Sequence, residues 1–300
     1  MFKWFFQKGV RQGIFWSFIA YLQCALQDVF IRQLKEIGTS LHMSEIMFFR
    51  FLFSLMSIFG AMLIFGKLHL MKTKIHGLHL ARGLLGSAML TLAAMGVMEM
   101  TLVENSAILF AQAFVTIIIA VLWLKEKVNS RIFVALLFGI VGVLSIAFAS
   151  GVDGISCKFN YKVFIPLSAA ILAAISSILI KKMTLLHENK CTMLFYFALY
   201  TTVISFIPAL LHWQTPNLHE LFYLLMYGVG ANLVQFFIFL AYEATEASKI
   251  AHMQYTEIPF SLMFGWMFFG EKPSQMVIVG ILFIVLGVVV SSKKDKCGCC

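Results

Sequence analysis

The sequence predicts an all-α membrane protein of about ten transmembrane helices, built as two inverted halves, from its composition, its apolar runs and its basic residues. Of its 300 residues, 61% are hydrophobic and 12% are charged, and the mean hydropathy is +0.90. So few polar side chains do not cover a water-facing surface. Because the apolar runs are continuous rather than alternating, they predict helices instead of the strands of a membrane barrel.

The apolar runs are long enough to cross a hydrocarbon core roughly 30 Å thick. The first predicted set of helices covers residues 12–31, 45–66, 77–98, 103–124 and 132–150. After a polar stretch at residues 151–162, the second set covers residues 163–183, 192–212, 219–242, 247–269 and 275–292. We therefore expect two domains of about five helices each, residues 1–150 and residues 151–300.

The basic residues predict the orientation of the chain. Most of the 23 Lys and Arg residues fall in the N-terminal segment, in alternate loops counted from it, and in the tail. Cytoplasmic loops are enriched in these residues, so we expect both termini in the cytoplasm and the helices in the lipids of a cell inner (plasma) membrane. An odd number of helices per half then inverts the second half relative to the first. The net charge of +9 forms no long basic stripe, so no nucleic-acid partner is predicted.

A short motif supports an internal repeat. Residues 124–127 (LKEK) close the predicted fourth helix as residues 269–272 (FGEK) close the ninth. The same shift in numbering brings Gly142 onto Gly287, each inside a similar apolar run. The agreement in helix order and in spacing is stronger evidence than either match alone.

These residues carry a family likeness. Residues 104–127, and the counterpart that ends at residues 270–273 (GEKP), resemble the EamA repeat of the drug/metabolite transporter superfamily, over nearly the whole chain. The resemblance implies two five-helix repeats that work by alternating access. One departure is Phe114, which stands where the family usually has proline, whereas Pro259 is kept in the ninth helix. A helix break is therefore expected in the second half only.

Three further segments resemble the S-adenosylmethionine uptake transporters of obligate intracellular bacteria more than they resemble amino-acid exporters. They are residues 42–51 (HMSEIMFFRF), 79–85 (HLARGLL) and 193–196 (MLFY).

Glu257 is the leading candidate for a substrate-binding residue. An ionisable group deep in a membrane helix is costly and needs a partner or a task. The repeat shift brings Gln112 to the equivalent position, so we expect the two side chains to approach the centre from opposite sides. Glu257 either receives a cationic substrate group or a coupling proton, or forms a neutral hydrogen bond between helices. Tyr255 is the aromatic residue nearest to it in sequence.

Asp28 and Arg50 are expected to meet near the outer ends of the first and second helices. The sequence leaves two interpretations open, because the guanidinium fork of Arg suits both. The pair is either a structural ion pair between neighbouring helices or part of a clamp for a substrate carboxylate.

The other candidates for substrate contact are aromatic rings, which stack on flat groups, and amides, which donate and accept hydrogen bonds. They are Trp16, Phe114, Gln23, Asn232 and Gln235. Packing between helices explains each of them equally well.

The resemblance implies a secondary transporter of a small polar metabolite, with S-adenosylmethionine as the leading substrate and a proton or a counter-substrate as the coupling partner. An exporter of amino acids or other amphipathic amines on the same fold is the alternative. A non-transporting membrane scaffold is the alternative of another class. The sequence has no phosphate-binding glycine loop, nucleophile elbow or metal-ligand cluster, so we expect no enzyme activity, no cofactor and no metal.

Overall fold

The computed structural model describes residues 10–66, 68–112, 115, 119, 130–149, 161–244 and 256–292. Within these ranges every regular element is helical. The first part of the chain forms α1 (Val10–Glu36), α2 (Met43–Ile64), the 3-10 helix η2 (Leu68–Met71), α3 (His76–Glu99), α4 (Leu102–Leu109) and α6 (Ser130–Ala149). The second part forms the 3-10 helix η3 (Tyr161–Val163), α7 (Phe164–Leu185), α8 (Lys190–Leu210), α9 (Leu218–Ala244), α11 (Glu257–Phe269) and α12 (Gln275–Ser292).

The described helices have the length and composition of a polytopic membrane protein. Five stretches are long and apolar enough to cross a membrane: Met43–Ile64, His76–Glu99, Tyr161–Ile180, Lys190–Leu210 and Leu218–Ile238. Two shorter apolar helices follow, Glu257–Phe269 and Gln275–Gly287.

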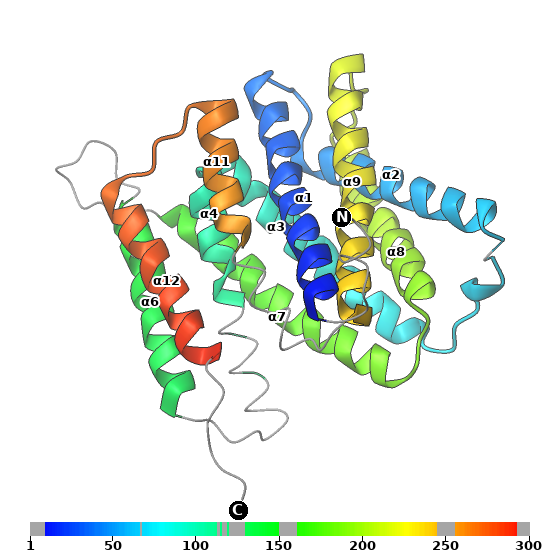
Figure 1. The fold of residues 1–300 in the computed structure, drawn as a ribbon. Helices are drawn as coiled ribbons and strands as arrows, with labels where there is room; N and C mark the ends of the chain where they lie inside the picture. Colours follow the sequence, from blue (N-terminus) through cyan, green and yellow to red (C-terminus); the bar gives the residue numbers. More distant parts are fainter. Residues whose placement is uncertain are drawn as a thin grey trace, which may run out of the picture.

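The most extensive helix contacts join the two parts of the chain to each other. Helix α1 packs on α9, α3 on α7, α2 on α8 and α6 on α12. Smaller contacts join α2 to α9, α3 to α8 and α4 to α11. Figure 1 shows α6 and α12 side by side at one side of the molecule, with α1 next to α9 nearer its middle. Neither part of the chain therefore has a separate core of its own.

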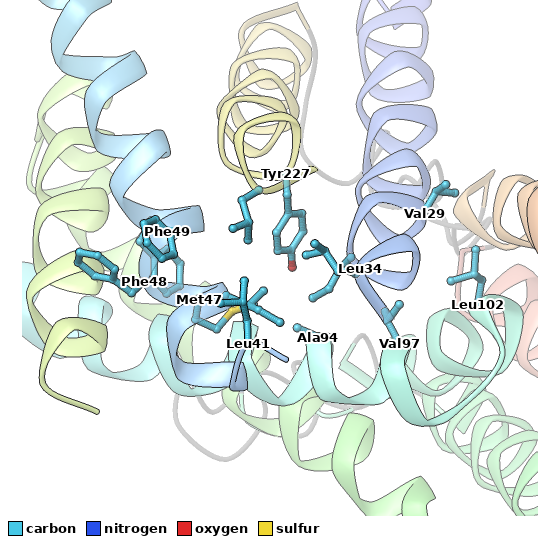
Figure 2. Close-up of a cluster of buried hydrophobic side chains, with 14 of the residues drawn as sticks. Val29, Leu34, Leu41, Met47, Phe48, Phe49, Ala94, Val97, Leu102 and Tyr227 are labelled. Atoms are coloured by element: carbon cyan, nitrogen blue, oxygen red, sulfur yellow. The ribbon is translucent and has the colours of Figure 1, made fainter. Parts of the chain in front are cut away.

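The larger buried apolar cluster lies among α1, α2, α3 and α9. It includes Leu34 of α1, Met47 and Phe49 of α2, Val97 of α3 and Tyr227 of α9. Figure 2 shows Tyr227 projecting from α9 into the space between α1 and α2. This cluster fixes the mutual positions of the three helices that supply most of the polar site described below.

The C-terminal end of α1 holds the C-terminal end of α3. Arg32 Nη1 donates hydrogen bonds to the carbonyl oxygens of Val97 and Met100, both at 2.8 Å, and Lys35 donates to Met98 O. The last carbonyls of a helix have no partner inside the helix, and cations near them are stabilising. This contact explains why α1 continues to Glu36, beyond the end at residue 31 that its apolar run predicts.

Glu271, in the repeated FGEK motif, ties the end of α11 to the first part of the chain. Its Oε2 atom accepts a hydrogen bond from the backbone N–H of Leu102 at 3.0 Å, and its Oε1 atom lies 3.7 Å from Arg32 Nη2. Burial raises the pKa of this carboxyl, and the Leu102 N–H and Arg32 oppose that rise. The matching LKEK motif at residues 124–127 lies outside the described residues.

We expect Glu271→Ala to lower the free energy of unfolding by about 2 kcal/mol or more, because it leaves the Leu102 N–H without its acceptor and removes a carboxylate beside Arg32. Glu271→Gln keeps an oxygen for the Leu102 N–H and should cost less. Thermal unfolding of purified protein in detergent measures both. The control is Lys162→Ala, which breaks an exposed pair with Glu99 and should change little. An equal loss in Glu271→Ala and Lys162→Ala would contradict this role for Glu271.

Candidate functional site

Two acidic residues and a thiol lie together where α1 meets α11. Cys24 and Asp28 are one helical turn apart, on the same face of α1. The side chains of Cys24 and Asp28 both lie close enough to Glu257 to interact with it electrostatically. Glu257 is 9% exposed. A carboxyl pair in a low-dielectric interior repels itself when both groups are charged, so this place favours a cation or a proton.

The local sequence explains why Glu257 stands at a helix end. Helix α11 begins at Glu257, inside the predicted span 247–269, and Pro259 lies in its first turn. Proline is tolerated there because the N–H groups of a first turn have no intrahelical acceptor. The N-terminal end of a helix also favours a negative charge. Residues 245–255, which include Tyr255, lie outside the described residues, as does Phe114.

Arg50 of α2 supplies the positive charge of the site. It is 8% exposed, and its Cζ atom lies 4.3 Å from the ring centre of Tyr227 and 5.4 Å from that of Phe51. The Nε and Nη1 atoms of Arg50 are buried and have no hydrogen-bond partner within the described part of the chain. Stacking on an aromatic ring offsets part of the cost of burying the guanidinium.

Asp28 of α1 and Arg50 of α2 interact electrostatically, but the ion pairs of 4.0 Å or less among the described residues join other groups. The attraction between Asp28 and Arg50 therefore leaves the Nε and Nη1 donors of the guanidinium without an acceptor among the described residues.

Two glycines let α9 approach this site. A Cβ atom at Gly228 would lie 2.6 Å from the carbonyl oxygen of Arg50, and one at Gly230 would lie 2.0 Å from Gln27 Nε2. Gln27 in turn donates to Met226 O at 3.3 Å. The absence of side chains at both glycines brings Tyr227 against Arg50.

The site lies well inside the helices. At a rise of 1.5 Å per residue, Asp28, Arg50 and Tyr227 are each roughly 10–14 Å from the ends of α1, α2 and α9 that meet near residues 37–42. These residues therefore lie roughly two turns or more inside their helices.

A family model decides which class of protein holds these groups. The model of the EamA-like transporter family matches residues 11–148 and residues 161–293. This chain belongs to the EamA-like transporter family. The two matched segments of this family member fall on either side of the predicted boundary near residue 150.

Individual relatives of this EamA-like chain carry the names of small-molecule transporters. The S-adenosylmethionine uptake transporter of Rickettsia bellii is 30% identical over 285 residues, 94% of each chain. The riboflavin transporter of Vibrio cholerae is 33% identical over 168 residues, 56% of this chain and 54% of that one. The pseudopaline exporter CntI of Pseudomonas aeruginosa strain UCBPP-PA14 is 25% identical over 296 residues, 96% of this chain and 98% of that one.

One crystal structure resembles this EamA-like chain in fold. It has a TM-score of 0.62 and 13% sequence identity, and the match covers 93% of this chain and 95% of that one. At this identity the similarity concerns the fold alone.

Other predicted site residues of this family member make contacts between helices. The Nδ2 atom of Asn232 donates to Ser54 O at 2.7 Å and to Ser57 Oγ, and its Oδ1 atom accepts from Ser54 Oγ at 2.8 Å. Both ends of this amide are thus used to join α9 to α2. Gln112 donates to Ser177 Oγ of α7 at 3.2 Å.

The remaining predicted residues line the contact between α1 and α9. The Trp16 ring stacks on Phe237, with centroids 5.6 Å apart and planes 9° apart. Gln23 lies against Gly230, and Gln235 is half-buried further along α9. Of the predicted set, the structure therefore gathers Asp28, Arg50 and Glu257 into one cluster.

The sequence interpretation missed Cys24, Gln27 and Tyr227. Cys24 has a signal, because it precedes Asp28 by one helical turn and must share its face. Tyr227 has none that separates it from other rings, since aromatic residues make up 15% of the chain.

We expect Gly228→Ala to destabilise the protein by about 1–3 kcal/mol, because the new methyl group meets the backbone of α2, which cannot rotate away. Gly60→Ala, in α2, is the matched control, since nothing lies within 4 Å of its Cβ position and alanine favours a helix. Thermal unfolding in detergent compares the two variants. Equal stability of both would contradict the close approach of α2 and α9.

Proposed function

We propose that this chain is a secondary transporter of the inner membrane that moves a small, charged metabolite by alternating access around the cluster of Asp28, Arg50 and Glu257. The observation that carries the proposal is the cluster of a buried Arg50, a buried Glu257 and a partly buried Asp28 from three helices, with two guanidinium nitrogens that have no hydrogen-bond partner among the described residues. Buried ionisable residues in membrane proteins mark substrate or ion pathways, because their cost needs a compensating function.

Two inverted repeats, residues 1–150 and 151–300, are the framework that we propose. The helix contacts support it, because they keep their pattern when the halves are exchanged. Exchange turns the α1–α9 contact into the α7–α3 contact and the α2–α9 contact into the α8–α3 contact. The α2–α8 and α6–α12 contacts are unchanged by the exchange, because each joins a helix to its own counterpart. A two-fold axis relating the halves produces this pattern.

A pair of glycines gives independent support for the repeat. The shift that brings Gly142 onto Gly287 also brings Gly83 onto Gly228. A Cβ atom at Gly83 would lie 2.6 Å from Tyr200 Cβ of α8, just as one at Gly228 would lie 2.7 Å from Phe53 Cβ of α2. Each glycine thus marks the close crossing of two helices from different halves.

The leading substrate is S-adenosylmethionine. Its ammonium and sulfonium groups suit the carboxyl groups of Asp28 and Glu257, and its carboxylate suits Arg50. The relative from Rickettsia bellii, which bears that name, aligns with 94% of the chain. A proton on Glu257 or a counter-substrate is the coupling partner that we propose.

The second candidate is export of an amphipathic amine on the same fold. The observation in its favour is that an exporter, of pseudopaline, aligns with 96% of this chain. Loss or accumulation of labelled substrate by cells that express the protein distinguishes the two directions.

We propose that the termini face the cytoplasm, and single cysteines in a background without the native thiols test this. A membrane-impermeant maleimide added to cells should label Ser40→Cys and Thr215→Cys, which are exposed beside the start of α2 and of α9. It should label Lys74→Cys and Leu186→Cys only after the cells are opened. The reverse pattern would invert the proposed orientation, and labelling of all four from outside would contradict the spans.

We expect Glu257→Gln to abolish uptake of labelled S-adenosylmethionine into proteoliposomes while leaving protein level and insertion unchanged, because the amide cannot carry a charge to match a cation. Glu99→Gln, which changes an exposed carboxylate at the end of α3, is the control and should transport normally. Wild-type transport by Glu257→Gln would remove this residue from the mechanism. Failure of the wild-type protein to move any metabolite under any gradient would favour a scaffold.

A further inference from the structure

Arg50 has the features of a binding group whose partner is absent. The residue is more than nine-tenths buried, and two of its guanidinium nitrogen atoms, Nε and Nη1, have no hydrogen-bond acceptor among the described residues. A buried donor without an acceptor is destabilising, and the effect is larger for a charged group. A guanidinium whose only task is to join α2 to its neighbours would use these donors within the protein.

Arg82 provides an internal comparison. It is 3% exposed, and its Cζ atom lies 4.7 Å from the Phe197 ring centre, so it is also buried against an aromatic ring. Its Nε atom, like that of Arg50, has no hydrogen-bond partner among the described residues, but its Nη1 atom donates to Met193 O of α8 at 3.2 Å. The repeat shift brings Arg82 onto Tyr227. The contact of Arg82 in α3 with Phe197 in α8 therefore corresponds to the contact of Tyr227 in α9 with Arg50 in α2, with the arginine on the opposite helix of the pair. Arg82 connects two helices, whereas Arg50 keeps the same atom open.

The charges around Arg50 limit what its partner is. Asp28 is attracted by the cation Arg50 and repelled by the second acid, Glu257. A simple anion would satisfy Arg50 but would be repelled by both acids. A simple cation would leave the Arg50 donors unsatisfied. A ligand with a carboxylate and an ammonium on the same carbon atom satisfies both sides.

We propose that Arg50, Asp28 and Tyr227 form a subsite for the zwitterionic head group of an α-amino acid. The carboxylate accepts hydrogen bonds from the Arg50 guanidinium, which the Tyr227 ring holds in place, and the ammonium lies beside Asp28. Glu257, which interacts with Cys24 and Asp28, would contact a second positive group further along the ligand. This proposal rests on the transport function above and narrows its substrate to amino acids that carry another cationic group.

A competition experiment in proteoliposomes that contain the full-length protein tests the subsite. The probe is labelled S-adenosylmethionine, competed by unlabelled S-adenosylmethionine or by its decarboxylated form, which lacks only the carboxylate. For the wild-type protein the decarboxylated compound should compete at least about tenfold more weakly. In Arg50→Gln the parent compound should weaken to the level of the decarboxylated one, so that their ratio falls to about one.

Arg82→Lys is the control and should keep the wild-type ratio, since Arg82 is assigned to the contact between α3 and α8. If Arg50→Gln does not accumulate, Arg50→Lys replaces it, and we expect a ratio between those of the other two proteins. Equal competition by both compounds at the wild-type protein overturns the subsite without any variant. An unchanged ratio in a folded Arg50 variant also overturns it.

The failure of the subsite and the failure of the transport function have different signatures. If the wild-type protein moves substrate but ignores the carboxylate, only the subsite is wrong. If the wild-type protein moves no metabolite under any gradient, the proposed function is wrong, and the subsite falls with it.

Discussion

The cost of keeping a guanidinium out of water is the constraint on which the centre of this protein depends. Arg50 is buried within a helix that is long and apolar enough to cross a membrane, where a charged group is stable only with compensating contacts. Among the described residues, the protein supplies the Tyr227 ring and the field of Asp28, and no hydrogen bond to Nε or Nη1. The close approach of α9 through Gly228 is what makes the first of these contacts available. The packing of α9 on α2 therefore determines the surroundings of the Arg50 charge.

A symmetric framework holds an asymmetric set of charges. The repeat shift aligns Asp28 of α1 with Ala173 of α7, and Glu257 with Gln112. Neither Ala173 nor Gln112 is ionisable, whereas Asp28 and Glu257 interact electrostatically. The acidic pair therefore has no counterpart at the related positions, which would give a charged ligand a single preferred place in the proposed site.

Most of the fold and part of the site could be predicted from the sequence. The helices follow from apolar runs, because a bilayer demands a fixed span length. The last turn of α1 could not be predicted from its apolar run, because polar contacts with α3 stabilise it. Asp28, Arg50 and Glu257 stand out because ionisable residues are rare within membrane helices. The role of Asn232 could not be predicted, since an amide can hydrogen-bond to a ligand or to a serine equally well. The structure shows that Asn232 bonds to Ser54. Tyr227 is defined by the fold that brings it to Arg50.

The alternating access that we propose would require contacts between the halves that break and re-form, and the helix ends hold polar contacts of this kind. Where α1 ends, Arg32 pairs with Glu271, and Thr39 donates a hydrogen bond to Glu220. At the opposite ends of the helices, His79 pairs with Glu188 of the loop that follows α7.

Water can hydrate the groups of each of these contacts after they separate, so breaking one contact costs less than separating the apolar cluster around Leu34 and Phe49. The apolar cluster joins α1, α2 and α9, which also hold Asp28, Arg50 and Tyr227. A rocking motion that exchanges the polar contacts but leaves this cluster intact would carry those three residues of the proposed binding site as one unit. In the transport cycle that we propose, the substrate then meets the same Asp28, Arg50 and Tyr227 from either side of the membrane.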